Sequence, residues 1–136
     1  MERARSTELS DSIRMVLRDP DPVMAQSAVV AELDRRAQQL LDDPAFTHWA
    51  QNIADALAGH DFLVGRLREW ALLHAVASGG SWSAEAVVTV SDWCQRKAVE
   101  VVDSRALLTM LAERGRTRRV RNAAMRRLTE PGLQIE

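Results

Sequence analysis

Hydrophobic residues recur every three or four positions along most of the chain, the spacing that places side chains on one face of an α-helix. Strict alternation, which is typical of a half-buried strand, has only one candidate segment, 86–90 (AVVTV). Because this segment lies between Ser83 and Asp92, residue types that favour helix starts, we interpret it as a buried helix. The pattern predicts an all-α fold of seven or eight short helices.

The apolar positions that repeat with the helical period are the candidate core. The segment after His60 has the strongest apolar face of the chain. In chain order, the candidates are Leu9, Ile13, Val16, Leu17, Val29 or Val30, Leu33, Ala37, Leu40, Leu41, Phe46, Trp49, Ile53, Leu57, Phe62, Leu63, Leu67, Trp70, Leu72, Leu73, Leu107, Leu108, Met110 and Leu111.

Proline, glycine and short polar residues mark where the helices begin and end. Asp21 is the predicted N-cap of the second helix and Pro22 its first residue; segment 43–44 (DP) repeats this arrangement before the third helix. Gly59 is expected to close the third helix, and segment 79–80 (GG) the fourth. The later helices are expected to begin at Ser81 or Ser83, after a bend near Ser91 and Asp92, at Asp103 or Ser104, and at Thr117, with a stop at Gly115.

Length and composition favour one folded domain. The chain has 136 residues, of which 46% are hydrophobic and 27% charged, values close to those of ordinary globular proteins. We therefore predict a single all-α domain over residues 1–130, followed by a flexible C-terminal tail over residues 131–136.

The sequence has no feature of export or membrane insertion. Cys94 is the single cysteine, so no intramolecular disulfide can form, and the N-terminal segment 1–10 has no apolar stretch of the kind found in signal peptides. The longest apolar run, 70–76, is interrupted by His74 and is far shorter than the roughly 20 residues of a membrane span. We expect a cytoplasmic protein that does not enter membranes.

No residue pattern points to catalysis, a metal or a cofactor. His48, His60 and His74 are separated by 12 and 14 residues, which matches no zinc-binding spacing. The acidic pairs flank prolines at helix starts, where carboxylates cap backbone N–H groups, and no glycine-rich phosphate loop is present. We therefore expect neither an enzyme nor a bound metal or cofactor.

Charge is concentrated near the C-terminus, although the formal net charge is only −1. Residues 113–136 contain seven basic and three acidic side chains, whereas residues 1–112 contain eleven basic and sixteen acidic ones. The candidate contact residues for a partner or nucleic acid are Arg114, Arg116, Arg118, Arg119, Arg121, Arg126 and Arg127.

The segment 117–128 has the pattern of an amphipathic helix. Its apolar stripe follows the i, i+3, i+4, i+8 spacing and consists of Val120, Ala123, Ala124 and Leu128. The arginines of this segment are then expected on its flanks and outer face. The sequence thus predicts a packed terminal helix with a basic exterior.

Segments 92–100 (DWCQRKAVE), 104–113 (SRALLTMLAE) and 118–128 (RRVRNAAMRRL) together resemble the alternating helices of HEAT-like repeats. Inner helices of such repeats often read Val-Arg-x-Ala-Ala-x-x-x-Leu, as the sequence does from Val120 to Leu128. The resemblance covers residues 92–128 and implies stacked helices that bind other macromolecules without catalysis. It makes the expected fold HEAT-like or an irregular helical bundle.

Segments 107–115 (LLTMLAERG) and 116–128 also resemble a helix-turn-helix, with the second segment as recognition helix. That resemblance implies contacts of the arginines with phosphates and guanines, and of Asn122 with base edges. Two functions therefore remain open. The favoured one is a noncatalytic scaffold or adaptor that binds a protein with an acidic surface, and the alternative is binding of nucleic acid.

Overall fold

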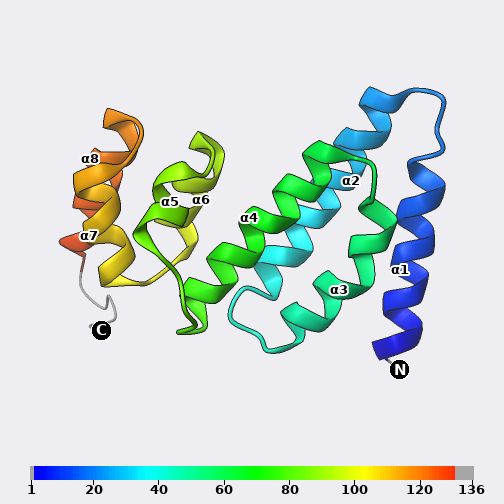
Figure 1. Ribbon diagram of the computed structural model, residues 1–136, viewed down its shortest axis with the longest axis horizontal. Helices are drawn as coiled ribbons and strands as arrows, with labels where there is room; N and C mark the ends of the chain where they lie inside the picture. Colours follow the sequence, from blue (N-terminus) through cyan, green and yellow to red (C-terminus); the bar gives the residue numbers. More distant parts are fainter. Residues whose placement is uncertain (1, 131–136) are drawn as a thin grey trace. The chain divides into compact units, whose positions relative to one another are not determined.

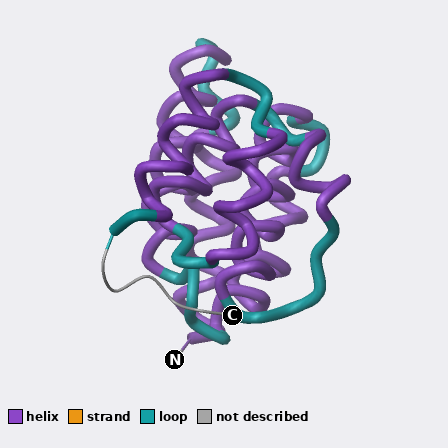
Figure 2. Tube along the Cα trace, turned by 90° about the vertical axis from the view of Figure 1, so that its left-hand side faces the viewer, coloured by secondary structure: helices purple, strands orange, loops and turns teal. Residues whose placement is uncertain are grey.

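The computed structural model describes residues 2–130, with side chains from Leu9 onward; within this range the chain is helical and forms no strand (Figures 1 and 2). The predicted all-α fold is confirmed. The eight helices of residues 2–130 are α1 (Glu2–Val16), α2 (Pro22–Gln39), α3 (Ala45–Leu57), α4 (Asp61–Ala77), α5 (Ala84–Thr89), α6 (Asp92–Val101), α7 (Arg105–Arg114) and α8 (Arg118–Leu128). The predicted tail, residues 131–136, lies outside the described residues.

The helices gather into two compact units, Met1–Ala71 and Leu72–Glu136. The boundary falls within α4, which contributes residues to both units. A single domain over residues 1–130 stays a prediction.

The starts of α2 and α3 show how far the aspartate–proline pattern determines a helix. At α2, Asp21 is the N-cap as predicted, and its Oδ1 accepts hydrogen bonds from the backbone N–H groups of Val23 and Met24 at 3.1 and 3.2 Å. At α3 the N-cap is Pro44, which provides no side-chain cap, and Asp43 Oδ1 accepts from Ala45 N at 2.8 Å. Asp43 thus lies two residues before the first residue of its helix, whereas Asp21 lies directly before its own.

Polar side chains connect the helices of the first unit across its apolar core. Asp34 on α2 accepts hydrogen bonds from Arg66 Nη1 at 2.5 Å and from Trp70 Nε1 at 2.8 Å, both on α4. Ser10 on α1 donates to the carbonyl of Asn52 on α3 at 2.7 Å. The buried apolar side chains of this unit are Ile13, Ala25, Val29, Leu33, Ala37, Leu41, Phe46, Trp49, Ile53, Ala56, Leu57, Leu63 and Trp70.

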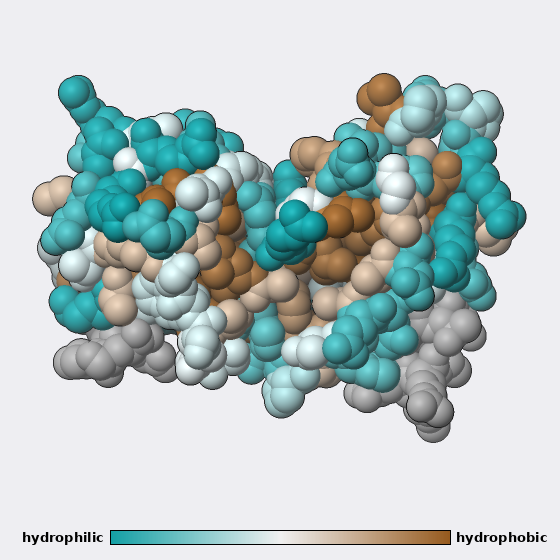
Figure 3. Space-filling model, in the orientation of Figure 1, coloured by the Kyte–Doolittle hydropathy of each residue, from teal (hydrophilic) through white to brown (hydrophobic). Residues whose placement is uncertain are grey.

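Two residues predicted to belong to the core are exposed. Val16, in the last turn of α1, is 39% exposed, because the helix ends there and the chain leaves toward the turn. Phe62 is 48% exposed, and its ring instead lies 5.2 Å from the guanidinium carbon of Arg66. Other exposed apolar side chains flank the α1–α2 turn, including Val23 and Met24, and Figure 3 shows brown atoms over the start of α2.

In the second unit, serine caps separate α5 from α6. Ser83 Oγ accepts from Ala86 N at 3.1 Å, and Ser91 Oγ accepts from Cys94 N at the same distance. Val90, at the end of α5, is extended, so the predicted bend near Ser91 is confirmed as a break between two helices.

A buried glutamine joins three segments of the second unit. Gln95 on α6 has no exposed surface; its Nε2 donates to the carbonyl of Val87 on α5 at 2.9 Å. Its Oε1 accepts from the backbone N–H of Arg116, in the α7–α8 turn, at 2.8 Å. Both ends of the amide are therefore used. The buried apolar side chains of the second unit are Leu73, Val76, Val87, Cys94, Ala98, Val99, Val102, Leu107, Leu108, Met110, Leu111, Val120 and Ala124.

Candidate binding groove between α6 and α8

The turn between α7 and α8 is short because a glycine ends one helix and a threonine caps the next. Gly115 N donates to the Leu111 carbonyl at 2.9 Å, and Thr117 Oγ1 accepts from Val120 N at 3.1 Å. Gly115 stops α7 as predicted, but its φ of −58° is not the left-handed conformation that glycine favours at helix ends. What requires glycine here is space: an added Cβ would lie 2.6 Å from Leu111 O.

The apolar stripe predicted on the last helix packs inward. Val120 is 1% exposed and Ala124 is fully buried, while Ala123 and Leu128 are half-buried. The exposed positions of α8 are Arg118, Arg119, Asn122, Met125 and Arg126. Arg118, Arg119 and Arg126 thus form the basic exterior predicted for this packed helix. Arg121 and Arg127 are half-buried.

Arg116 is held by the start of α6. Its Nε lies 3.1 Å from Asp92 Oδ1, and its Nη1 donates to the carbonyl of Val90 at 3.1 Å. Together with the bond from its backbone N–H to Gln95, these contacts fix the α7–α8 turn against α6.

Arg127 is held at the other end of α8. Its Nη2 lies 2.5 Å from Asp103 Oδ1, its Nη1 donates to the carbonyl of Val99, and its Nε lies 3.3 Å from Glu130 Oε2. A guanidinium with three acceptors is a structural clamp between α8 and the end of α6.

Two further arginines also have partners within the unit. Arg121 Nη1 donates to the carbonyl of Gly115 at 2.8 Å, closing the turn that precedes its own helix. Arg114 Nη2 lies 3.3 Å from Glu85 Oε1 on α5, in an exposed pair that contributes little to stability.

The remaining three candidate arginines, Arg118, Arg119 and Arg126, have no carboxylate oxygen within 4.0 Å among residues 9–130. Arg118 and Arg119 also occupy the first turn of α8, which contains no acidic residue. Because the N-terminal end of a helix has a partial positive charge, cations are unfavourable there. An external anion would relieve this repulsion.

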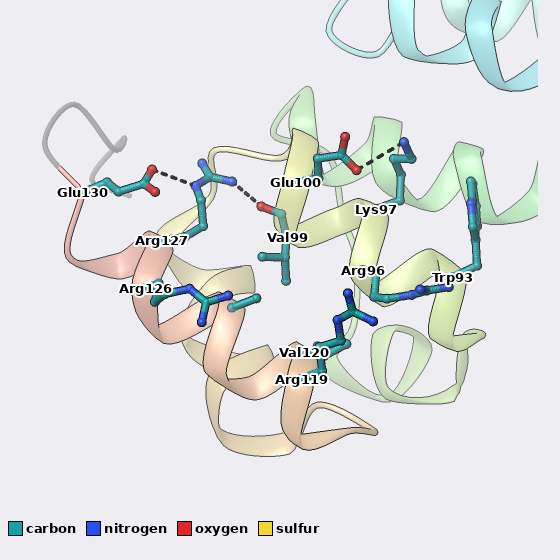
Figure 4. Close-up of a pocket in the computed structure, with 11 residues that line it drawn as sticks. Trp93, Arg96, Lys97, Val99, Glu100, Arg119, Val120, Arg126, Arg127 and Glu130 are labelled. Atoms are coloured by element: carbon teal, nitrogen blue, oxygen red, sulfur yellow. Dashed lines mark hydrogen bonds and ion pairs between the residues drawn. The ribbon is translucent and has the colours of Figure 1, made fainter.

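Arg119 and Arg126 line a groove of about 540 Å³ between α6 and α8 (Figure 4). From α6, the lining residues are Trp93, Arg96, Lys97, Val99 and Glu100. From α8 and the residues after it, they are Arg119, Val120, Ala123, Arg126, Arg127 and Glu130. The groove therefore combines five cations with two carboxylates, an aliphatic floor and one tryptophan.

The two carboxylates in the groove already have cationic partners. Glu100 Oε2 lies 3.3 Å from Lys97 Nζ, and Glu130 Oε2 lies 3.3 Å from Arg127 Nε (Figure 4). Arg96 resembles Arg119 and Arg126 in having no carboxylate partner among residues 9–130. Three guanidinium groups in one groove thus have no carboxylate partner within the part of the chain whose side chains are described.

The α6 half of this groove is not among the residues predicted from the sequence, which all lie between Arg114 and Arg127. A signal was present, because Trp93, Arg96, Lys97 and Glu100 follow the i, i+3, i+4, i+7 spacing of one helical face. That spacing reveals a polar stripe on α6, but only the fold shows that it lies opposite α8.

Other classes of site have little support among the described residues. Within residues 9–130, no three histidine, cysteine, aspartate or glutamate side chains gather in a way that could hold a metal ion. No histidine lines the α6–α8 groove. Within residues 2–130, no helix has both the length and the apolar character needed to cross a membrane.

Comparisons with protein-family models, with curated proteins and with solved structures found no match to this chain. Helices α6, α7 and α8 cover the three segments that resemble HEAT-like repeats, and α7 and α8 cover the two that resemble a helix-turn-helix. Both resemblances stay predictions.

Proposed function

We propose that the chain is a noncatalytic interaction module that binds a protein with an acidic surface through the exposed arginines of α8. The observation that supports this most directly is the contrast within the arginine cluster. Four members have acceptors inside the second unit, whereas Arg118, Arg119 and Arg126 have no carboxylate partner among residues 9–130. Unpaired guanidinium groups on one helix steer and orient an acidic partner.

The proposal is tested by reversing these three charges. The variant Arg118→Glu/Arg119→Glu/Arg126→Glu leaves the clamps at Arg116, Arg121 and Arg127 intact, so the fold is retained. A matched control reverses three exposed arginines elsewhere, Arg18, Arg68 and Arg105, and changes the net charge by the same amount.

Both variants and the unmodified protein are immobilised and exposed to nuclease-treated cell lysate, and the retained proteins are identified by mass spectrometry. We expect a set of acidic proteins that the unmodified protein and the control retain and that the α8 variant loses. Equal retention by all three proteins, or retention of no acidic protein, would contradict the proposal.

A second candidate function is binding of duplex DNA through the outer face of α8. Arg118 and Asn122 are both exposed on this face, one turn apart, and could reach a phosphate and a base edge. This function requires a mobility shift of duplex DNA at low salt and a linear fall of log affinity with log salt concentration. Absence of any shift at low salt excludes it.

A further inference from the structure

We propose that the α6–α8 groove binds an acidic peptide segment of the partner, with one apolar side chain seated between flanking carboxylates. This inference rests on the proposed function and assigns it a specific site and a ligand class. It is carried by three properties of the groove, namely its unpaired charge, its apolar floor and the position of its own carboxylates.

The unpaired charge consists of three guanidinium groups on two facing helices. Arg96 projects from α6, and Arg119 and Arg126 project from α8 (Figure 4). A guanidinium presents donors in a planar fork that matches the two oxygens of a carboxylate. The groove can thus accept two or three carboxylates without breaking the ion pairs of Lys97 and Arg127.

The floor of the groove is apolar. Val99 and Val120 are buried beneath it, Ala123 is half-buried, and Trp93 is half-buried at the α6 side. Small aliphatic side chains between charged walls leave room for one medium-sized apolar side chain, which gains from contact with the tryptophan and the valines. A ligand that carried only charged groups would make no apolar contact with this floor.

The spacing of the arginines fits a short peptide. Arg119 and Arg126 are seven residues apart on α8, which is two helical turns or about 10 Å along the axis. An extended chain covers that distance in about three residues. Side chains alternate along an extended chain, so acidic residues two positions before and two positions after an apolar one share its face and can reach both guanidinium groups through their flexible side chains.

The groove's own carboxylates favour a peptide over a nucleic acid. Glu100 and Glu130 line the groove. Their carboxylates would repel a phosphodiester backbone lying along it, because every linkage of that backbone is negatively charged. A peptide can place uncharged residues opposite them. The same groove therefore discriminates between the two classes of polyanion.

The test uses fluorescence anisotropy with a labelled peptide, Gly-Glu-Asp-Leu-Glu-Asp-Gly. Two companion peptides replace the leucine by serine, or the four acidic residues by their amides. We expect the leucine peptide to bind about tenfold tighter than the serine peptide and the amide peptide not to bind measurably. Equal affinity for the leucine and serine peptides would overturn the assignment of the apolar floor.

Variants locate the binding site. Arg119→Glu/Arg126→Glu is expected to weaken binding by at least about tenfold, because two carboxylate contacts become repulsive. The control Arg68→Glu/Arg105→Glu reverses two exposed arginines outside both the groove lining and α8 and changes the net charge equally, so binding should stay within about threefold, because exposed charges away from the site are screened by salt. Ala123→Leu fills the floor without altering charge, and is expected to abolish the preference for leucine over serine.

The outcomes separate this inference from the proposed function. If the triple reversal of α8 abolishes capture of acidic proteins while the groove variants leave peptide affinity unchanged, the module function stands and the groove assignment is wrong. If the triple reversal has no effect on capture, the proposed function fails. Tighter binding of a single-stranded oligothymidine than of the leucine peptide would overturn the peptide assignment in favour of nucleic acid.

Discussion

Replacing Gly115 by alanine tests whether the α7–α8 turn depends on the absence of a side chain. The backbone angles at Gly115, φ −58° and ψ 147°, are ordinary for alanine, so conformational strain plays no part. An added Cβ would lie 2.6 Å from Leu111 O, 2.9 Å from Val120 Cγ1 and 3.2 Å from Arg121 Cγ. Leu111 O is a backbone atom of α7, so it cannot move aside as the end of a flexible side chain can.

Two opposing effects determine how much Gly115→Ala changes the free energy of unfolding. Alanine restricts the unfolded chain and, where it fits, stabilises by about 0.4–1 kcal/mol. Overpacking of a filled site costs about 1–3 kcal/mol, and the upper end applies when backbone must shift. We expect Gly115→Ala to lower the free energy of unfolding by about 2 kcal/mol. Gly65, inside α4, is the matched control: an added Cβ meets nothing within 4 Å, so Gly65→Ala should stabilise by about 0.5–1 kcal/mol.

Urea unfolding followed by far-UV circular dichroism measures both variants against the unmodified protein. Amide hydrogen exchange then locates the effect, because loss of protection in Gly115→Ala should be greatest in α7 and α8. If Gly115→Ala were as stable as the unmodified protein or more so, the close approach of α7 and α8 at this residue would be refuted. A destabilised Gly65→Ala would show that the general benefit of alanine does not apply to this chain.

Two other predictions concern polar contacts. Gln95→Leu removes both hydrogen bonds of a buried amide and leaves two backbone groups without a partner, so urea unfolding should show a loss of about 2–4 kcal/mol, against less than about 0.5 kcal/mol for the exposed control Gln51→Leu. The hydrogen-bonded Arg35 guanidinium, at 2.5 and 3.0 Å, lowers the pKa of Glu32 below its ordinary 4.5. The pair therefore stabilises the fold above pH 4.5, and this contribution is lost as the pH falls through the lowered pKa. An NMR titration should show the pKa of Glu32 rising toward 4.5 in Arg35→Gln, and a Glu32 that already titrates there in the unmodified protein would contradict the pairing.

The helix starts were predictable because the interactions that set them are local. Asp21 and Thr117 cap backbone N–H groups two or three residues ahead, so a short window of sequence contains both partners. The end of α7 at Gly115 is predictable from the sequence. The reason that glycine is required there, the close packing of α7 against α8, is not, because it depends on residues of both helices. Phe62 has a helical spacing consistent with burial, yet a solvent-exposed position beside Arg66.

The candidate site was only partly predictable because charge pairing is nonlocal. Arg127 pairs with Asp103, which is separated from it by 24 positions in the sequence, and Arg114 pairs with Glu85 over 29 positions. Helical periodicity therefore cannot predict which arginines form ion pairs. For the same reason Arg96 stayed outside the predicted cluster, although it shares a groove with Arg119. The sequence predicts the basic segment, and the fold shows which of its side chains face outward without a carboxylate partner among residues 9–130.

The cations of the α6–α8 groove that have no carboxylate partner among residues 9–130 are all guanidinium groups, and no histidine lines it. A guanidinium keeps its proton at every pH that a cell reaches. In the proposed interaction, the attraction of the groove for a carboxylate therefore rests on groups of permanent charge. Control of such an interaction passes to the ligand, whose affinity would rise when a kinase adds phosphate beside its acidic residues and fall when a phosphatase removes it.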